Sequence, residues 1–220
     1  MSGRGVRRPE RHLVVMAKAP RLGQAKRRLA ADIGAFAALA FYRAGLMRLL
    51  RRLKQPRRWR LWLYVTPDRA ARARAGWPPG LALRPQGRGD LGARMRRPLA
   101  ALSPGPVVIV GSDIPALAPA HIAAAFAALG SHDLVFGPAA DGGYWLVGAR
   151  RRPLPPQLFR HVRWSSGDAL ADTLAGIAGR FSVARLATLE DVDDGASYRR
   201  AALRDAAFGG SSGRGQHENT

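Results

Sequence analysis

The chain has 220 residues, 47% of them hydrophobic and 23% charged, and it contains no cysteine. This composition predicts one globular domain, and it excludes disulfides, a thiolate nucleophile and cysteine-ligated zinc or iron–sulfur sites. Lys and Arg number 36 against 15 Asp and Glu, so the formal net charge is +21. The apolar runs are too short to span a bilayer, and the basic N-terminus has no apolar signal region, so we expect a cytoplasmic protein without a membrane span.

The positive charge is carried almost entirely by arginine, because Lys18, Lys26 and Lys54 are the only lysines. In a chain rich in Ala, Gly and Pro, this bias is typical of a GC-rich coding sequence. No basic block is interleaved with aromatic residues, and no helix-turn-helix or RNA-binding signature is present. Binding to nucleic acid is therefore predicted to be weak, salt-sensitive and without sequence preference.

Short apolar runs alternate with segments of helical periodicity along the chain. Strands are predicted at residues 12–17, 59–66, 81–85, 107–111, 133–136, 143–148 and 181–186. Helices are predicted at residues 26–54, with a break at Gly34, and at 90–102, 118–129, 167–179 and 196–208. This order predicts a single-domain α/β fold over residues 12–208, with a mostly parallel sheet and helices on both faces. The Gly-, Ser- and Arg-rich ends, 1–11 and 209–220, are predicted to be disordered tails.

The loop after the first strand has the composition of a phosphate-binding site. Residues 17–29 read AKAPRLGQAKRRL, so Pro20 and Gly23 precede a helix whose first turn is basic. Free amides at a helix N-terminus together with nearby cations favour phosphate binding, and two of the three lysines lie here. The loop matches neither GxxxxGK[ST] nor GxGxxG. A basic loop without a function is the alternative.

Carboxylates follow two of the predicted strands. Asp113 comes after VVIVGS, at a strand's carboxyl end, where open parallel sheets collect ligands and where a carboxylate can bind Mg²⁺. Asp141 opens an Asp-Gly-Gly segment that also fits a simple hairpin turn. Residues 190–194 hold four acids, which either face a metal or balance surface charge. For Asp113, capping of the next turn is the alternative.

Six motifs occur in the order expected for a known family. They are MAKAPRLGQAKRRLA, QGRGDLGARM at 86–95, GSDIPALAP at 111–119, LVFGPAADGGYWLVG at 134–148, VRWSS at 162–166 and DVD at 191–193. Together they resemble the bacterial arsenosugar-biosynthesis-type glycosyltransferases of the GT-A nucleotide-diphospho-sugar transferase superfamily, over about residues 12–205. The same superfamily contains the phospholactate, phosphoenolpyruvate and molybdenum-cofactor guanylyltransferases, which have a similar lysine-bearing loop.

The resemblance implies roles for particular residues. Lys26 would be the phosphate-binding lysine, and Asp113 and Asp193 would bind Mg²⁺ or Mn²⁺. Asp141 is the candidate catalytic residue. Further contacts to the nucleotide and its phosphates are expected from Ala17, Lys18, Pro20, Gly23, Gln86, Gly89 and Asp90, and contacts to the sugar or acceptor from Gly142, Gly143 and Tyr144.

The sequence departs from the family pattern in two places. Arg27 stands where the family usually has Thr, and residues 191–198 read DVDDGASY where it usually has DVDTPEDL. Because of these differences, the resemblance predicts the fold more firmly than it predicts the activity.

Three functions remain open from the sequence. The leading hypothesis is glycosyl transfer from a nucleoside-diphosphate sugar to a small-molecule acceptor, with the metal and Lys26 stabilising the departing diphosphate. The alternative is nucleotidyl transfer, in which an acceptor phosphate attacks the α-phosphate of an NTP and pyrophosphate leaves. The lack of a Gly-x-Gly-x-Arg segment before the lysine favours glycosyl transfer. The third is a non-catalytic anion or nucleic-acid binder.

Overall fold

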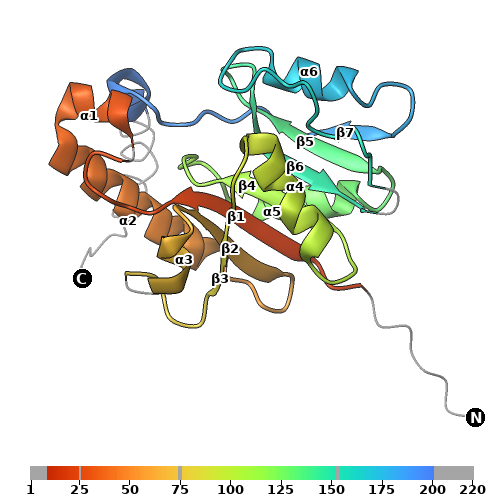
Figure 1. Cartoon of the computed structure of the whole chain (residues 1–220), viewed down its shortest axis with the longest axis horizontal. Coiled ribbons are helices and arrows are strands. Elements are labelled where there is room, and N and C mark those ends of the chain that lie inside the picture. The colour runs from red at the N-terminus through yellow and green to blue at the C-terminus, as the bar shows by residue number, and fades with distance from the viewer. Residues whose placement is uncertain (1–8, 25, 74–75, 152–153, 201–220) are drawn as a thin grey trace, which may run out of the picture.

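The structure, a computed structural model, describes residues 9–24, 26–73, 76–151 and 154–200 and contains one seven-stranded sheet (Figure 1). Its strands are β1 (His12–Lys18), β2 (Arg60–Thr66), β3 (Ala82–Pro85), β4 (Val107–Gly111), β5 (Leu134–Pro138), β6 (Tyr144–Ala149) and β7 (Val183–Arg185). Its helices are α1 (Arg27–Ile33), α2 (Ala35–Leu53), α3 (Arg69–Ala73), α4 (Leu91–Ala101), α5 (Pro119–Ala128) and α6 (Ala169–Ala175).

The sheet is mostly parallel, as the sequence predicted. Its strand order is β3-β2-β1-β4-β6-β5-β7. β1 pairs in parallel with both β2 and β4, whereas β6 is antiparallel to β4 and to β5, from which it follows by a hairpin. The carboxyl ends of β1 and β4 therefore lie side by side, which is the place where an open parallel sheet binds ligands.

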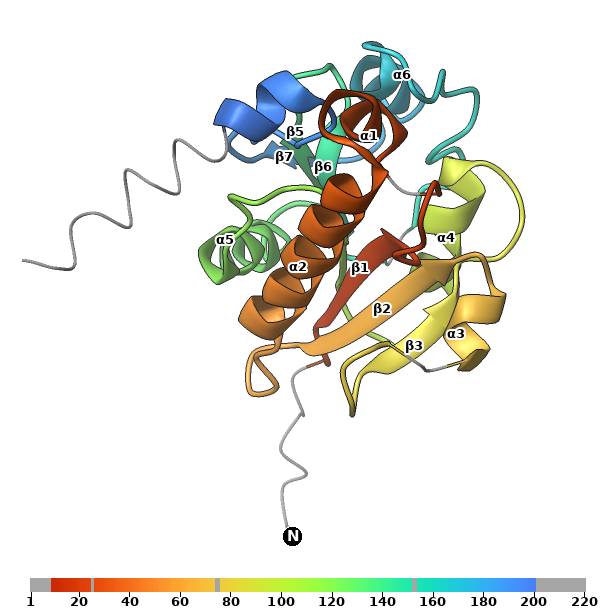
Figure 2. The same cartoon turned by 90° about the vertical axis from the view of Figure 1, so that its left-hand side faces the viewer.

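Alternation of side chains along β1 explains the two cores of the protein. Leu13, Val15 and Ala17 pack with α2 and α5 on one face, and Val14 faces the opposite core with α4. Figure 2 shows α2 and α5 in front of the sheet and α4 behind it. Apolar residues on both faces are what a parallel sheet covered by helices requires.

The predicted break at Gly34 is confirmed. Gly34 separates α1 from α2 with a φ of +86°. A residue with a Cβ could adopt this φ only at a cost in conformational free energy. One short helix, α3, was not predicted, because its sequence, RAARA, is too short to show an apolar period. Residues 195–200 begin the expected last helix, and its remainder lies outside the described residues, as do positions 1–8 and 209–220 of the expected tails. No helix of the described chain is long and apolar enough to cross a membrane.

Candidate active site

The loop after β1 ends on a lysine with a left-handed backbone. Lys26 has φ +55° and ψ +47°, and it stands immediately before α1, where its carbonyl accepts a hydrogen bond from the backbone N–H of Ala30. Gly23, with φ +71°, makes the preceding turn. This loop turns the chain back over the sheet, so that the Lys26 side chain points towards the end of β4 and not into solvent.

Lys26 connects two distant acidic segments. Its Nζ lies 3.0 Å from Asp113 Oδ2 and 2.6 Å from Asp193 Oδ1, and it donates to the Val192 carbonyl at 2.6 Å. Only 5% of the lysine side chain is exposed, against 38% and 50% for the two aspartates. The three residues that the sequence placed in the phosphate and metal sites are therefore in direct contact.

The electrostatics keep this lysine charged. Burial lowers the pKa of Lys26, but attraction to the carboxylates of Asp113 and Asp193 outweighs burial and raises the pKa above its ordinary value. The backbone holds the acidic segment in place, since the Val192 N–H donates to the Asp113 carbonyl at 3.0 Å. The site thus combines a protonated ammonium with carboxylates that stay accessible to solvent.

Two further carboxylates face the same region. Burial, followed by repulsion from Asp193 and from Asp141, raises the pKa of Asp191 to about 6. Asp141 is exposed, and its Oδ1 accepts a hydrogen bond from the Gly143 N–H at 2.9 Å. Asp141 therefore shapes the hairpin turn, as one sequence interpretation held, and it also contributes negative charge to the site. Asp191 belongs to the acidic segment 190–194 noted in the sequence, in which only Asp193 was assigned a role of its own.

A buried tyrosine that the sequence analysis missed organises the floor of the site. Tyr42 on α2 donates to the Lys18 carbonyl at 2.8 Å, accepts from the Lys18 N–H at 3.0 Å and lies 3.3 Å from Ser112 Oγ. These contacts join the end of β1 to the loop that carries Asp113. Burial raises the pKa of Tyr42. Its position in an apolar helical stripe gave no signal for this role.

The predicted nucleotide contacts at 86–90 have structural partners of their own. Gln86 is buried, and its Nε2 donates to the carbonyls of Ala17 and Tyr64, both at 3.0 Å, so it ties together the ends of β1 and β2. Asp90 caps α4 by accepting from the Ala93 N–H at 2.7 Å. Arg97 donates to the Gln86 and Arg88 carbonyls and holds the loop, a role that no sequence pattern indicated.

Tyr144, expected at the acceptor pocket, packs into the second core. Its ring lies edge-on to Phe136 and Trp164, with centroid distances of 5.3 Å and 6.4 Å. The Tyr144 hydroxyl and the Trp164 indole N–H are both buried, and no described group is placed to form a hydrogen bond with the Trp164 indole. Burial raises the pKa of Tyr144, which also lies near Thr173. Gly142 and Gly143 lie closer to the surface, in the turn before β6.

A cavity of about 520 Å³ opens beside Lys26, between α2 and the segment 195–200. The charged residues of its lining are Lys26 and Asp113 of the candidate site and Arg48 and Arg52 of α2. The remaining lining residues are Phe41, Tyr42, Gly45, Leu49, Ser112, Ile114, Pro115 and Tyr198. Its size is within the range of small-molecule sites.

The sequence profile of a family described as uncharacterized and conserved in bacteria, DUF2064, matches residues 49–166. The chain belongs to the DUF2064 family. The matched part contains Asp113 and Asp141–Tyr144, and Lys26 and Asp193 lie outside it. A search of curated protein sequences found no match to this DUF2064 protein.

Solved structures similar to this chain include proteins described as transferases. A candidate nucleotide-diphospho-sugar transferase of Desulfovibrio desulfuricans G20 is similar with a TM-score of 0.77 and 27% identity, over 90% of this chain and 95% of that chain. For 4-diphosphocytidyl-2C-methyl-D-erythritol synthase of Anaerococcus prevotii DSM 20548, the TM-score is 0.59, the identity 9% and the coverage 90% and 98%. A Mycobacterium tuberculosis H37Rv protein, complexed with manganese, has a TM-score of 0.53 and 20% identity, with 87% and 97% covered. The fold of the DUF2064 protein is therefore that of the nucleotide-diphospho-sugar transferases.

Proposed function

We propose that this DUF2064 protein is a metal-dependent transferase that uses a nucleotide-activated donor, and that it transfers a glycosyl group from a nucleoside-diphosphate sugar. The observation that carries the proposal is the convergence of Lys26, Asp113 and Asp193 at the carboxyl ends of β1 and β4. In this fold that edge of the sheet is where nucleotides bind. A buried ammonium beside two solvent-accessible carboxylates offers both a phosphate contact and a place for a cation.

The donor set suits Mg²⁺ or Mn²⁺ bound together with a nucleotide. Among the described residues, no group of three or more His, Cys, Asp or Glu side chains forms a metal site by itself. Asp113 and Asp193, however, both reach the Lys26 ammonium, and Mg²⁺ commonly takes one or two carboxylates and completes its shell with water and substrate phosphates. We therefore assign Asp113 and Asp193 as the residues that would hold the metal, which would neutralise charge on the diphosphate.

The protein's own residues would bind and orient the donor. Lys26 stays protonated at neutral pH, so it can exchange a carboxylate contact for a phosphate oxygen and stabilise the negative charge that develops on the leaving diphosphate. Asp141, exposed at the turn before β6, is the proposed general base for an acceptor hydroxyl. Ala17, Lys18, Pro20, Gly23, Gln86, Gly89 and Asp90 would form the walls around the nucleotide, and Gly142 and Gly143 those around the sugar or acceptor. The Tyr144 side chain would support this turn from the second core and would not contact the acceptor.

Nucleotidyl transfer is the second candidate. Several proteins of the same fold act with CTP, among them an inositol-1-phosphate CTP transferase of T. maritima, with 12% identity and a TM-score of 0.57. Glycosyl transfer is favoured because the loop before Lys26 lacks the Gly-x-Gly-x-Arg segment, and because the more similar D. desulfuricans protein carries the sugar-transferase assignment at 27% identity. The resemblance to the arsenosugar-biosynthesis-type glycosyltransferases is part of the proposal of glycosyl transfer.

The two candidates release different products, and this decides between them. The purified protein is incubated with Mg²⁺ or Mn²⁺ and a panel of nucleoside-diphosphate sugars and NTPs, together with candidate acceptors bearing hydroxyl or phosphate groups. Glycosyl transfer releases a nucleoside diphosphate, and nucleotidyl transfer releases pyrophosphate. Pyrophosphate release alone, dependent on a phosphorylated acceptor, replaces the first proposal by the second.

A matched pair of variants ties the product to the site. Asp113→Asn keeps the shape of the side chain but removes the charge a cation needs, so metal-dependent nucleotide binding measured by calorimetry should be lost. Glu10→Gln makes the same change of charge at the other end of β1 and should leave binding unchanged. Unaltered metal-dependent affinity in Asp113→Asn would remove this residue from the proposed site.

A further inference from the structure

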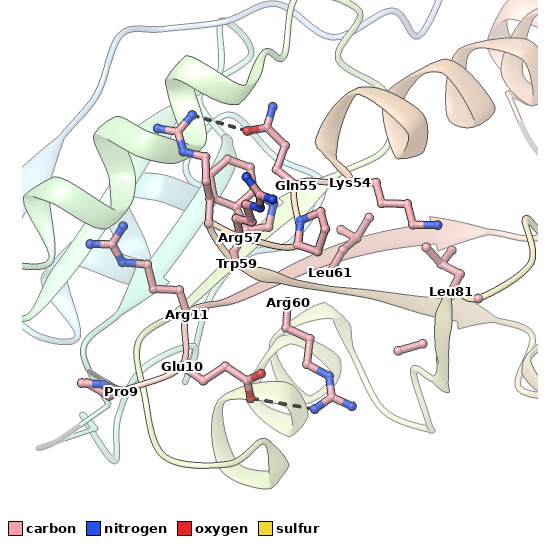
Figure 3. Close-up of a pocket in the computed structure, with 14 residues that line it drawn as sticks. Pro9, Glu10, Arg11, Lys54, Gln55, Arg57, Trp59, Arg60, Leu61 and Leu81 are labelled. Carbon is pink, nitrogen blue, oxygen red and sulfur yellow. Dashed lines mark hydrogen bonds and ion pairs between the residues drawn. The ribbon is translucent and has the colours of Figure 1, made fainter. Parts of the chain in front are cut away.

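A second cavity, of about 720 Å³, lies at the amino ends of β1, β2 and β3 (Figure 3). It is built from three stretches of chain: residues 9–11 before β1, residues 54–61 around the start of β2, and residues 80–82 at the start of β3. The length of β1, about 20 Å of extended strand, separates this edge from the edge where Lys26 lies. The cavity is thus distinct from the proposed transferase site.

The lining of this cavity is strongly basic. Five cationic side chains line it against the single carboxylate of Glu10, and all five belong to residues exposed to solvent. They are Arg11, Lys54, Arg57, Arg58 and Arg60. Within the described part of the chain, the side chains of Lys54 and Arg57 have neither a hydrogen bond nor an ion pair. Positive charge gathered at a concave surface, with one carboxylate against five cations, attracts anions.

Buried aromatic rings hold three of these arginines in position, and the Arg11 guanidinium lies 5.6 Å from the ring centroid of Phe126. The Arg58 guanidinium lies 5.2 Å from the ring centroid of Trp59, and the Arg60 guanidinium lies 4.4 Å from that of Trp62. Arg60 also pairs with Glu10 at 3.9 Å, one of the contacts drawn in Figure 3. Stacking on a ring holds a guanidinium in place without neutralising its positive charge. Less conformational entropy is therefore lost when an anion binds.

The geometry favours a small anion over a nucleic acid. A volume of about 720 Å³ is within the range of small-molecule sites. Trp59, the aromatic residue of the lining, is only 3% exposed, and its indole N–H already donates to the Leu53 carbonyl. No ring of this lining is therefore available to stack on an unpaired base.

We propose that this basic cavity binds a small polyphosphorylated molecule, at a site separate from Lys26 and independent of the proposed transfer reaction. Clustered phosphates match its clustered cations, since guanidinium and ammonium groups form charge-assisted hydrogen bonds to phosphate oxygens. Leu61 and Leu81 close the floor of the cavity, and both are at most 9% exposed, so the cations supply most of the surface open to a ligand.

The test measures binding of inorganic tripolyphosphate by calorimetry, at about 0.15 M salt, where long-range attraction is screened. The variant K54Q/R57Q removes the two cations without partners and should weaken binding about tenfold. The matched control, R180Q/R185Q, loses the same charge from two exposed arginines near β7 and should bind as the unaltered protein does. Lys26→Ala should retain this binding event, because Lys26 belongs to the other edge.

Other outcomes overturn the proposal. Equal weakening in K54Q/R57Q and in R180Q/R185Q would show that only net charge acts, and loss of the binding event in Lys26→Ala would place it at the transferase site. Absence of tripolyphosphate binding at this salt concentration rules the site out. Competition arms with a single-stranded oligonucleotide and with vesicles of anionic lipid identify the source of phosphate. If either displaces tripolyphosphate at much lower phosphate concentration, the natural ligand is not a small molecule.

Discussion

Two lysines at opposite edges of the sheet are in contrasting environments. Lys26 is buried, and it contacts two carboxylates and a carbonyl within 3.0 Å. Lys54 is exposed, and no described side chain or carbonyl pairs with its ammonium group. In a chain whose positive charge is otherwise carried by arginine, the same residue type is fixed at one edge and free at the other.

The difference shows how the two edges are built. Cross-links between distant segments hold the carboxyl edge together: Lys26 to Asp193, Val192 to Asp113, and Tyr42 to Ser112. At the amino edge, cations lie near one another with little counter-charge and rest on buried aromatic rings. Substitutions at the carboxyl edge should therefore affect both folding and binding, whereas those at the amino edge should affect anion binding alone.

The largest change in ligand affinity is expected for Lys26→Ala. A charge-assisted hydrogen bond contributes about 1.5–3 kcal/mol, so affinity for a nucleoside diphosphate should fall about 10- to 150-fold, while affinity for the nucleoside should not change. Arg180→Ala, which removes one positive charge from an exposed residue that lines neither cavity, serves as the control and should leave both affinities unaltered. Calorimetric titration of each variant gives the comparison. Equal losses for the two ligands would show that Lys26 acts through the fold and not through a phosphate contact.

A second large effect is expected at the turn before β6. Gly142 has φ +82°, and a Cβ added there would overlap the carbonyl of Gly167, so Gly142→Ala should lower the free energy of unfolding by about 3 kcal/mol or more. Gly23 has a similar φ of +71° but open space around it, so Gly23→Ala should lose only about 1–2 kcal/mol. Denaturant unfolding measures both. Similar losses would mean that the contact with Gly167 is easily relieved.

A smaller effect is expected for Tyr42→Phe. Removing the hydroxyl leaves the Lys18 N–H and carbonyl without this partner, which should lower the free energy of unfolding by about 1–3 kcal/mol. Tyr198→Phe is the control, because that ring lies edge-on to Phe41 at 5.0 Å and its hydroxyl has no partner among the described residues. If Tyr42→Phe were as stable as the control, backbone pairing alone would hold the floor of the site in place.

The smallest effect concerns acid stability. A hydrogen bond from the Arg163 side chain, the largest cause, lowers the pKa of Asp172 to about 2. A lowered folded-state pKa stabilises the protein above the unfolded-state value of about 3.9, and this contribution is lost as the pH falls towards 2. In Asp172→Asn the unfolding temperature should therefore decrease less between pH 5 and pH 2.

Arg163→Gln provides the control for this acid effect, because it removes the partner of Asp172 and should weaken the pH dependence in the same way. The Arg163 side chain is 66% exposed to solvent, so screening by salt keeps the difference small. A pH dependence unchanged in Asp172→Asn would mean that this ion pair forms too rarely to matter in solution.

The fold could be predicted from the sequence because its signals are local. Apolar runs such as 107–111 form strands, the helical period at 26–54 forms α1 and α2, and Gly34 breaks them where a positive φ is needed. Within the site, the family resemblance assigned roles to Lys26, Asp113 and Asp193, because each lies in one of the matching motifs. Their mutual contact is a property of the folded sheet.

The sequence by itself determined the strand and helix pattern, the parallel α/β class and the motifs that carry charged side chains. Only the tertiary structure decided which groups meet: that Tyr42 holds the end of β1, that Gln86 joins β1 to β2, and that Tyr144 turns into the core. The physical reason is that periodicity depends on neighbours a few residues apart, whereas the side-chain hydrogen bonds of Tyr42 and Gln86 to β1 and β2 join residues 22 to 69 positions apart. Such partners are set by strand order and by packing of the two cores, which no local pattern records.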